Sequence, residues 1–238
     1  MAMNKPVYPA ACLSLVLILA ACVEIGDMET ETRTVAVGDA ESAVLDLNMG
    51  AGELDLHAGA SDLVEATFNY NVENWRPEID HDVFGNKRRI EIRQGKNKGV
   101  PLGPARNEWH ISLNKNMPFE IKIDFGAGEG HIDLRDLLAE SLAVNMGVGD
   151  LTVDLTGRRS RDMHVDIDGG IGSVTFYLPK HIGIRARVDK GIGSVDAGGM
   201  HKQGNLYINE ANGRSGATIS MNINAGIGSI DLKIIDGG

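Results

Sequence analysis

The chain of 238 residues has only 2 cysteines, 7 prolines and 5% aromatic residues. It also has no apolar run long enough to cross a bilayer, which takes about 20 residues. Its 23 basic residues are outnumbered by 33 acidic ones, and the net charge of −10 argues against a nucleic-acid binder, which needs a basic footprint. Low proline beside 30 glycines argues against a low-complexity tail and indicates many tight turns between strands.

The longest apolar run lies at the N-terminus and predicts an export signal. Lys5 precedes an apolar segment that ends in Leu19-Ala20-Ala21-Cys22. Small residues before a cysteine resemble the lipobox of bacterial lipoproteins, in which the cysteine is acylated and becomes the mature N-terminus. We therefore expect a lipoprotein signal peptide over residues 1–21, lipidation (palmitate) at Cys22 and a linker over 22–32; an ordinary secretory signal is the alternative.

Cleavage before Cys22 would leave a mature chain with a single cysteine. Such a chain cannot form an internal disulfide, so its stability must come from packing. Val23, rather than an aspartate, follows the cysteine, which resembles an outer-membrane sorting signal if the organism is Gram-negative. The expected location is the bacterial cell envelope, with the membrane as a partner through the lipid.

The mature chain contains an internal repeat built on a Gly-φ-Gly unit, where φ is a small or aliphatic residue. The central units are spaced by 21, 23 and 21 residues, and the last spacing of 35 indicates a 14-residue insertion around residues 202–216. A fixed period of this length is typical of solenoids. The units begin at Gly50, Gly126, Gly147, Gly170, Gly191 and Gly226.

Apolar residues recur at matching positions around each unit and alternate with polar ones. Leu151, Val153 and Leu155 follow one unit, and Val174, Phe176 and Leu178 follow the next. A period of two with β-branched enrichment predicts strands. We expect an all-β protein, a β-solenoid of short strands separated by glycine turns and stacked coil on coil over residues 33–238. An ordinary β-sandwich with glycine hairpins is the alternative.

A polar column stands two residues before each glycine unit. One interpretation is turn chemistry, because Asn and Asp cap backbone N–H groups and tolerate left-handed conformations. The other is a divalent cation, since stacked carboxylates would repel one another unless protonated or bridged. The main expectation is turn chemistry, with no metal. The column consists of Asn48, Asp124, Asn145, Asp168, Asp189 and Asn224.

The glycine units disappear between Asn69 and Pro118, where a locally basic segment leaves room for further coils or a folded insertion. Within it Lys87–Arg93 alternates, which predicts Ile90 and Ile92 facing inward. Arg89 and Arg93 then face outward, either as a plain solvated strand face or as an interaction surface for anionic envelope material.

A further pattern lies in Leu47–Leu54, in the segment Asn107–Asn114 with Ile123–Gly128, and in Asn145–Leu151. Together these stretches resemble the toast-rack domain family, adhesin-like β-solenoids of bacterial envelope proteins, and the resemblance covers roughly residues 33–238. It implies the fold and the compartment, and no catalytic residue or cofactor. The chain lacks the several transmembrane helices of the family's envelope-stress regulators.

Catalytic motifs are missing, so we expect no enzyme. There is no Gly-x-Ser-x-Gly and no His-Glu-x-x-His, and the histidines are scattered singly. The expected function is a scaffold or interaction module that binds an envelope protein or polymer. The alternative is an accessory sensor of envelope stress, and a carbohydrate or metal binder is a third interpretation.

The position of the last coil is also predicted. Because only four residues follow Ile234, the last coil is expected at an open end, either as an interaction edge at Ile235 or covered by the insertion.

Overall fold

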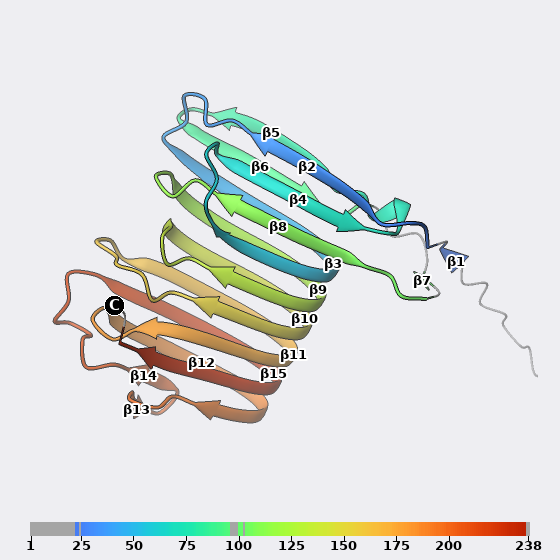
Figure 1. Cartoon of the computed structure of the whole chain (residues 1–238). Coiled ribbons are helices and arrows are strands. Elements are labelled where there is room, and N and C mark those ends of the chain that lie inside the picture. Colours follow the sequence, from blue (N-terminus) through green and yellow to red (C-terminus); the bar gives the residue numbers. More distant parts are fainter. Residues whose placement is uncertain (1–21, 24, 96–99, 102, 237–238) are drawn as a thin grey trace, which may run out of the picture.

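The protein is described by a computed structural model that covers residues 22, 23, 25–95, 100, 101 and 103–236 (Figure 1). The predicted signal peptide, residues 1–21, lies outside the described residues. Within them the chain is almost entirely β. Its elements are β1 (Cys22–Val23), β2 (Glu29–Val35), β3 (Ser42–Ala58), β4 (Val64–Tyr70), the 3-10 helix η1 (Glu73–Trp75), β5 (Glu78–Phe84), β6 (Lys87–Arg93), β7 (Val100–Pro101), β8 (Asn107–Leu113), β9 (Pro118–Asp133), β10 (Leu138–Asp154), β11 (Met163–Pro179), β12 (Gly183–Asp196), β13 (His201–Gln203), β14 (Leu206–Ile208) and β15 (Thr218–Ile235).

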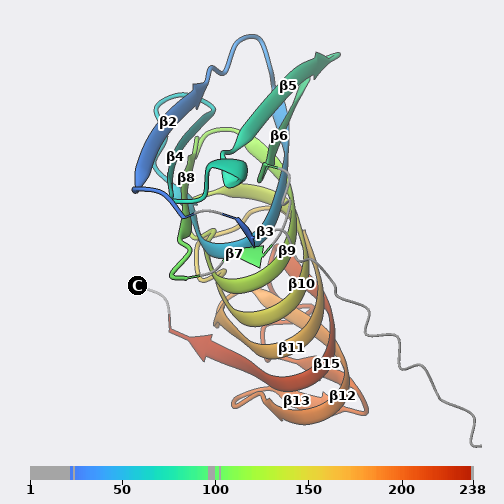
Figure 2. The same cartoon turned by 90° about the vertical axis from the view of Figure 1, so that its right-hand side faces the viewer.

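Six long parallel strands, each carrying one Gly-φ-Gly unit, form the body of a single sheet. They lie in the order β3, β9, β10, β11, β15, β12, and each bends in its middle so that its two arms fold toward each other (Figures 1 and 2). The expected solenoid-like fold is confirmed. The expectation of short strands separated by glycine turns is wrong: the strands are 14 to 18 residues long and run through the glycines.

The coils do not follow one another in chain order. Strand β15 pairs in parallel with β11 on one side and with β12 on the other. The prediction that the last coil lies at an open end is therefore wrong, because its edges are both occupied. The insertion does cover an end of the sheet, but the strand it covers is β12, through an antiparallel pair between β14 and Arg185–Arg187.

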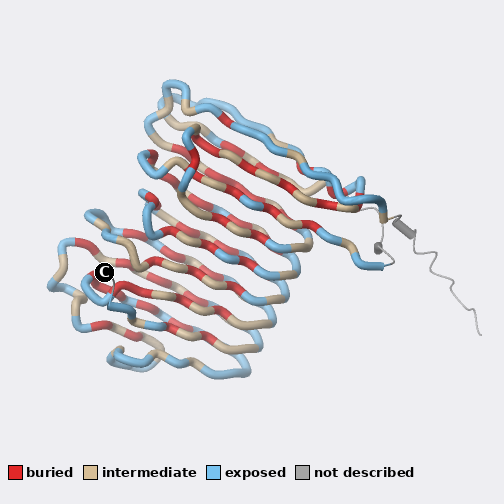
Figure 3. The backbone as a smooth tube through the Cα atoms, viewed as in Figure 1, coloured by how far each residue is buried: buried red, intermediate tan, exposed pale blue. Residues whose placement is uncertain are grey.

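The predicted inward residues fill one continuous core between the two arms (Figure 3). Neighbouring strands pair in register, so equivalent apolar residues line up in columns across the sheet, as expected for stacked coils. One such column is fully buried and consists of Leu47, Ile123, Val144, Ile167, Ile223 and Val188.

The basic middle segment supplies a seventh coil in two pieces. Strand β6 pairs with the first arm of β3, and β8 pairs with its second arm. Ile90 and Ile92 are buried as predicted, and Trp109 is buried against Phe68 in an edge-to-face contact. Strands β5, β4 and β2 then cover this end of the sheet. Because β2 starts at Glu29, the sheet takes in the last residues of the expected linker.

Close approach between neighbouring bends requires glycine at the third position of the unit. A Cβ added to Gly149 would lie 1.8 Å from the carbonyl oxygen of Gly128, and Gly149 has a φ of +141°. An L-residue at this position is thus strained by its backbone and also meets backbone that cannot move aside.

We predict that Gly149→Ala lowers the free energy of unfolding by more than about 3 kcal/mol, through backbone strain together with the clash. The measurement is urea unfolding of the purified mature chain. Gly216→Ala is the control, because its added Cβ meets nothing within 4 Å and its φ is not in the positive range. It should change stability by less than about 1 kcal/mol. Equal stability of the two variants would contradict the packing described for the bend.

Candidate functional site

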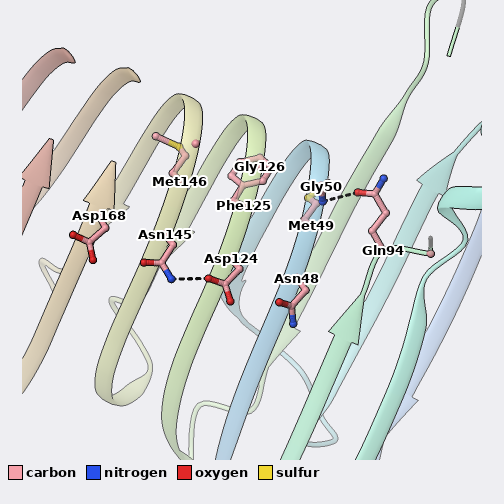
Figure 4. Close-up of a pocket in the computed structure, with 12 residues that line it drawn as sticks. Asn48, Met49, Gly50, Gln94, Asp124, Phe125, Gly126, Asn145, Met146 and Asp168 are labelled. Carbon is pink, nitrogen blue, oxygen red and sulfur yellow. Dashed lines mark hydrogen bonds between the residues drawn. The ribbon is translucent and has the colours of Figure 1, made fainter. Parts of the chain in front are cut away.

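The outer surface of the bend is the feature from which we build the site. Its glycines leave a shallow groove of about 640 Å³ that crosses β3, β9, β10 and β11 (Figure 4). Gln94 closes one end of the groove by accepting hydrogen bonds from the backbone N–H groups of Gly50 and Ala51, at 2.8 and 3.2 Å. One side of the bend carries polar side chains, and the crest carries aliphatic ones.

The polar side is a ladder in which amides and carboxylates alternate. In the order of the strands it reads Asn48, Asp124, Asn145, Asp168, Asn224, Asp189, and we call these residues the Asn/Asp ladder. Asn145 Nδ2 donates to Asp124 Oδ1 at 2.6 Å (Figure 4), and Asn224 Nδ2 donates to Asp168 Oδ1 at 2.8 Å.

These bonds correct the expectation of turn chemistry. Two pairs of ladder side chains bond across strands to each other, and Asn48 donates to Asp46 on its own strand, whereas capping would require bonds to turn backbone. The hydrogen bond from Asn145, together with Lys122, holds the pKa of Asp124 below its usual value against the opposing effect of burial. A carboxylate with a lowered pKa stabilises the fold above its unfolded pKa, and this contribution is lost as pH falls through the folded pKa.

The strand order separates the carboxylates of the ladder. In chain order Asp168 and Asp189 would be neighbours, with two like charges side by side. With β15 inserted, Asn224 separates them, and at the outer end Asn205 Nδ2 donates to Asp189 Oδ1 at 2.8 Å. In the part of the chain that the structure describes, no group of three His, Cys, Asp or Glu residues is arranged to hold a metal ion.

The crest of the bend carries the φ residues, which the sequence interpretation treated only as parts of the repeat. Four of them form a continuous aliphatic row on neighbouring strands, and we call this row the bend ridge. Their side chains are large apolar ones at positions where β3 and β9 carry alanine, and they remain exposed. The bend ridge consists of Val148 (51% exposed), Ile171 (51%), Ile227 (49%) and Ile192 (74%).

The residues that follow the glycine units divide the bend into two chemically different halves along the sheet. On β3, β9 and β10 the unit is followed by an acidic residue, Glu53, Glu129 or Asp150. On β11, β15 and β12 the sequence is Gly-Ile-Gly-Ser each time, so identical tetrapeptides lie in register. Three identical copies in one chain are the sequence signal that could have identified this surface.

Comparison with known proteins places the chain in a family. The profile described as the N-terminal domain of toast_rack (DUF2154) matches residues 24–177. The chain belongs to the toast-rack family. A search of curated proteins finds no match.

The chain is also similar to solved structures. A candidate cell adhesion protein from Clostridium sporogenes is 38% identical, with a TM-score of 0.85, and the alignment covers 88% of this toast-rack chain and 100% of that one. A candidate adhesin from Bacteroides fragilis is 12% identical over 87% of this chain and 97% of that one, with a TM-score of 0.35.

The toast-rack fold places Arg89 and Arg93 on the outer face of β6, as predicted, and gives both of them carboxylate partners. Arg89 pairs with Asp46 at 3.2 Å. Arg93 contacts Glu78, Asp80 and Glu91, which raise its pKa further above its ordinary value. Internally paired guanidinium groups are less available to an anionic ligand, so this geometry favours the solvated strand face.

The remaining predicted positions are spread over the domain rather than brought together. Ile235 ends β15 at 38% exposure, opposite Pro179 and far along the arm from the bend. Cys22 belongs to β1, whose backbone pairs with Val100 in β7, and its lipidation stays a prediction. Within the described ranges, no helix has the length and hydropathy to cross a membrane.

We predict that Asn224→Asp destabilises the toast-rack domain by about 1 kcal/mol relative to Asn224→Ala at pH 7, because it creates three adjacent carboxylates. Repulsion raises their folded pKa values above the unfolded value of about 3.9. The penalty is therefore present at neutral pH and disappears as pH falls toward 3. Urea unfolding of both variants at pH 7 and pH 3 measures it, and the alanine variant controls for the lost hydrogen bond. A difference in unfolding free energy between the two variants that does not change with pH would contradict the arrangement described for the ladder.

Proposed function

We propose that this toast-rack domain is a non-enzymatic interaction module of the bacterial cell envelope, held at the membrane by a lipid on Cys22. In this proposal the bend ridge is its contact surface. The observation that carries it is the exposure of Val148, Ile171, Ile227 and Ile192 in one row, because contiguous exposed apolar residues mark interaction sites. The description of the Clostridium sporogenes relative as a candidate cell adhesion protein supports the same class of function.

The position of the N-terminus supports a contact near the membrane surface. Strand β1, which contains Cys22, lies on the side of the sheet where the long strands bend (Figures 1 and 2). A lipid on Cys22 would turn this side toward the membrane. Glu53, Glu129 and Asp150 line the first half of the bend and would repel anionic head groups. We therefore propose an envelope protein or polymer with an apolar surface as the partner, rather than the lipid itself.

Crosslinking in intact cells, followed by membrane fractionation, tests the anchor and the ridge separately. Cys22→Ser should release the protein from the membrane fraction, because the lipid is then missing. Ile171→Lys should leave the protein in the membrane fraction and remove its crosslinks to partners, because it places a charge in the middle of the ridge.

Val83→Lys is the matched control, since Val83 is exposed to a similar extent (53%) but lies on β5, away from the bend. It should keep both the membrane fraction and the crosslinks. Partner crosslinks that persist in Ile171→Lys would show that the ridge is not the contact surface. A Cys22→Ser protein that stays on the membrane would contradict the anchor.

A further inference from the structure

Strand β12 ends the row of long strands, and the outer edge of its second half is open. Strand β14 covers Arg185–Arg187. The next groups, the backbone N–H of Val188 and the side chain of Asp189, bond to Asn205. From Lys190 to Asp196 this edge pairs with no other strand among the described residues, whereas the inner edge pairs with β15 throughout.

The exposed fractions of the ridge side chains show the effect of a missing neighbour at the open edge. Ile171 and Ile227 each have a ridge neighbour on both sides, and about half of each side chain is exposed. Ile192 has a neighbour on one side only and is 74% exposed. One more strand of the same kind would cover Ile192 as Ile192 covers Ile227.

The chemistry of this edge is compatible with pairing between two copies of the chain. The protein is acidic, so two copies repel each other over most orientations. At this end, however, Ser173, Ser229 and Ser194 replace the carboxylates of the other half. The sheet itself shows, in parallel pairing, that the backbones of Gly-Ile-Gly-Ser segments can lie side by side at the bend.

We propose that the edge Lys190–Asp196 of β12 pairs with the same edge of a second copy, antiparallel and centred on Ile192. The two-fold arrangement joins two sheets end to end and continues the bend ridge across the junction. This proposal names a second copy of the chain as one partner of the bend. It rests on the proposed function only because both treat the bend as a contact surface.

The side chain of Lys190 blocks part of this edge in the single copy. Its ammonium group donates to the backbone carbonyl of Gly193, so a charged side chain occupies an acceptor that a new strand would need. Pairing must displace this bond, which keeps the association weak and reversible. A lipid anchor would raise the effective concentration of copies at the membrane and so favour a weak contact.

Sedimentation velocity over a range of concentrations tests the proposal with the mature chain carrying Cys22→Ser. This chain should show a reversible monomer–dimer equilibrium. Ile192→Lys should weaken dimerisation at least tenfold, and Lys190→Ala should strengthen it. Val148→Lys is the matched control: it introduces the same charge on the same ridge, but on β10, which has strands on both sides, and it should leave the dimer unchanged.

Disulfide formation under a mild oxidant gives a second measurement, because it traps even a weakly populated dimer covalently. With Ile192→Cys, two copies meet at the two-fold axis and should form a crosslinked dimer, whereas Val148→Cys should not. A chain that stays monomeric at all concentrations, or a dimer that Ile192→Lys leaves intact, would overturn the proposal. Either result leaves the cellular test of Ile171→Lys unaffected, so the two proposals can fail separately.

Discussion

Close packing of backbone at the bend is the constraint on which the rest of the structure depends. At the third position of each inner unit, a Cβ would lie under 2 Å from the carbonyl oxygen of the neighbouring glycine, as at Gly172 (1.7 Å) and Gly228 (1.6 Å). The strands can therefore pass the bend only in register and only with glycine. Register in turn aligns every flanking position into a column, which produces the core, the Asn/Asp ladder and the bend ridge.

The repeat, the inward residues and the family could be predicted from the sequence, because each depends on local spacing. The strand order could not. Strands β12 and β15 carry the same Gly-Ile-Gly-Ser and nearly the same apolar positions, so either one fits beside β11 on packing alone. The alternation of Asn and Asp distinguishes the two orders, since only β15 brings an amide, Asn224, between Asp168 and Asp189. A charge argument applied to the column would have found it.

In-register stacking of the coils determines the surface. It places three identical tetrapeptides at one end of the bend and the acidic residues Glu53, Glu129 and Asp150 at the other. The polar column that suggested a cation from sequence is satisfied internally, and the basic strand β6 is paired with carboxylates. The crest of the bend is exposed and apolar, and the second half of β12 has an open backbone edge. The functional proposals follow from these two features.

Engineered disulfides at the bend test the strand order most directly, in the mature chain carrying Cys22→Ser. In-register neighbours on parallel strands lie about 4.8 Å apart, within disulfide range, while residues two strands apart are about twice as far and outside it. Pairs of cysteines at Ser173 with Ser229, and at Ser229 with Ser194, should each form an intramolecular disulfide, and Ser173 with Ser194 should not. Rapid crosslinking of Ser173→Cys with Ser194→Cys, and none with Ser229→Cys, would contradict the account.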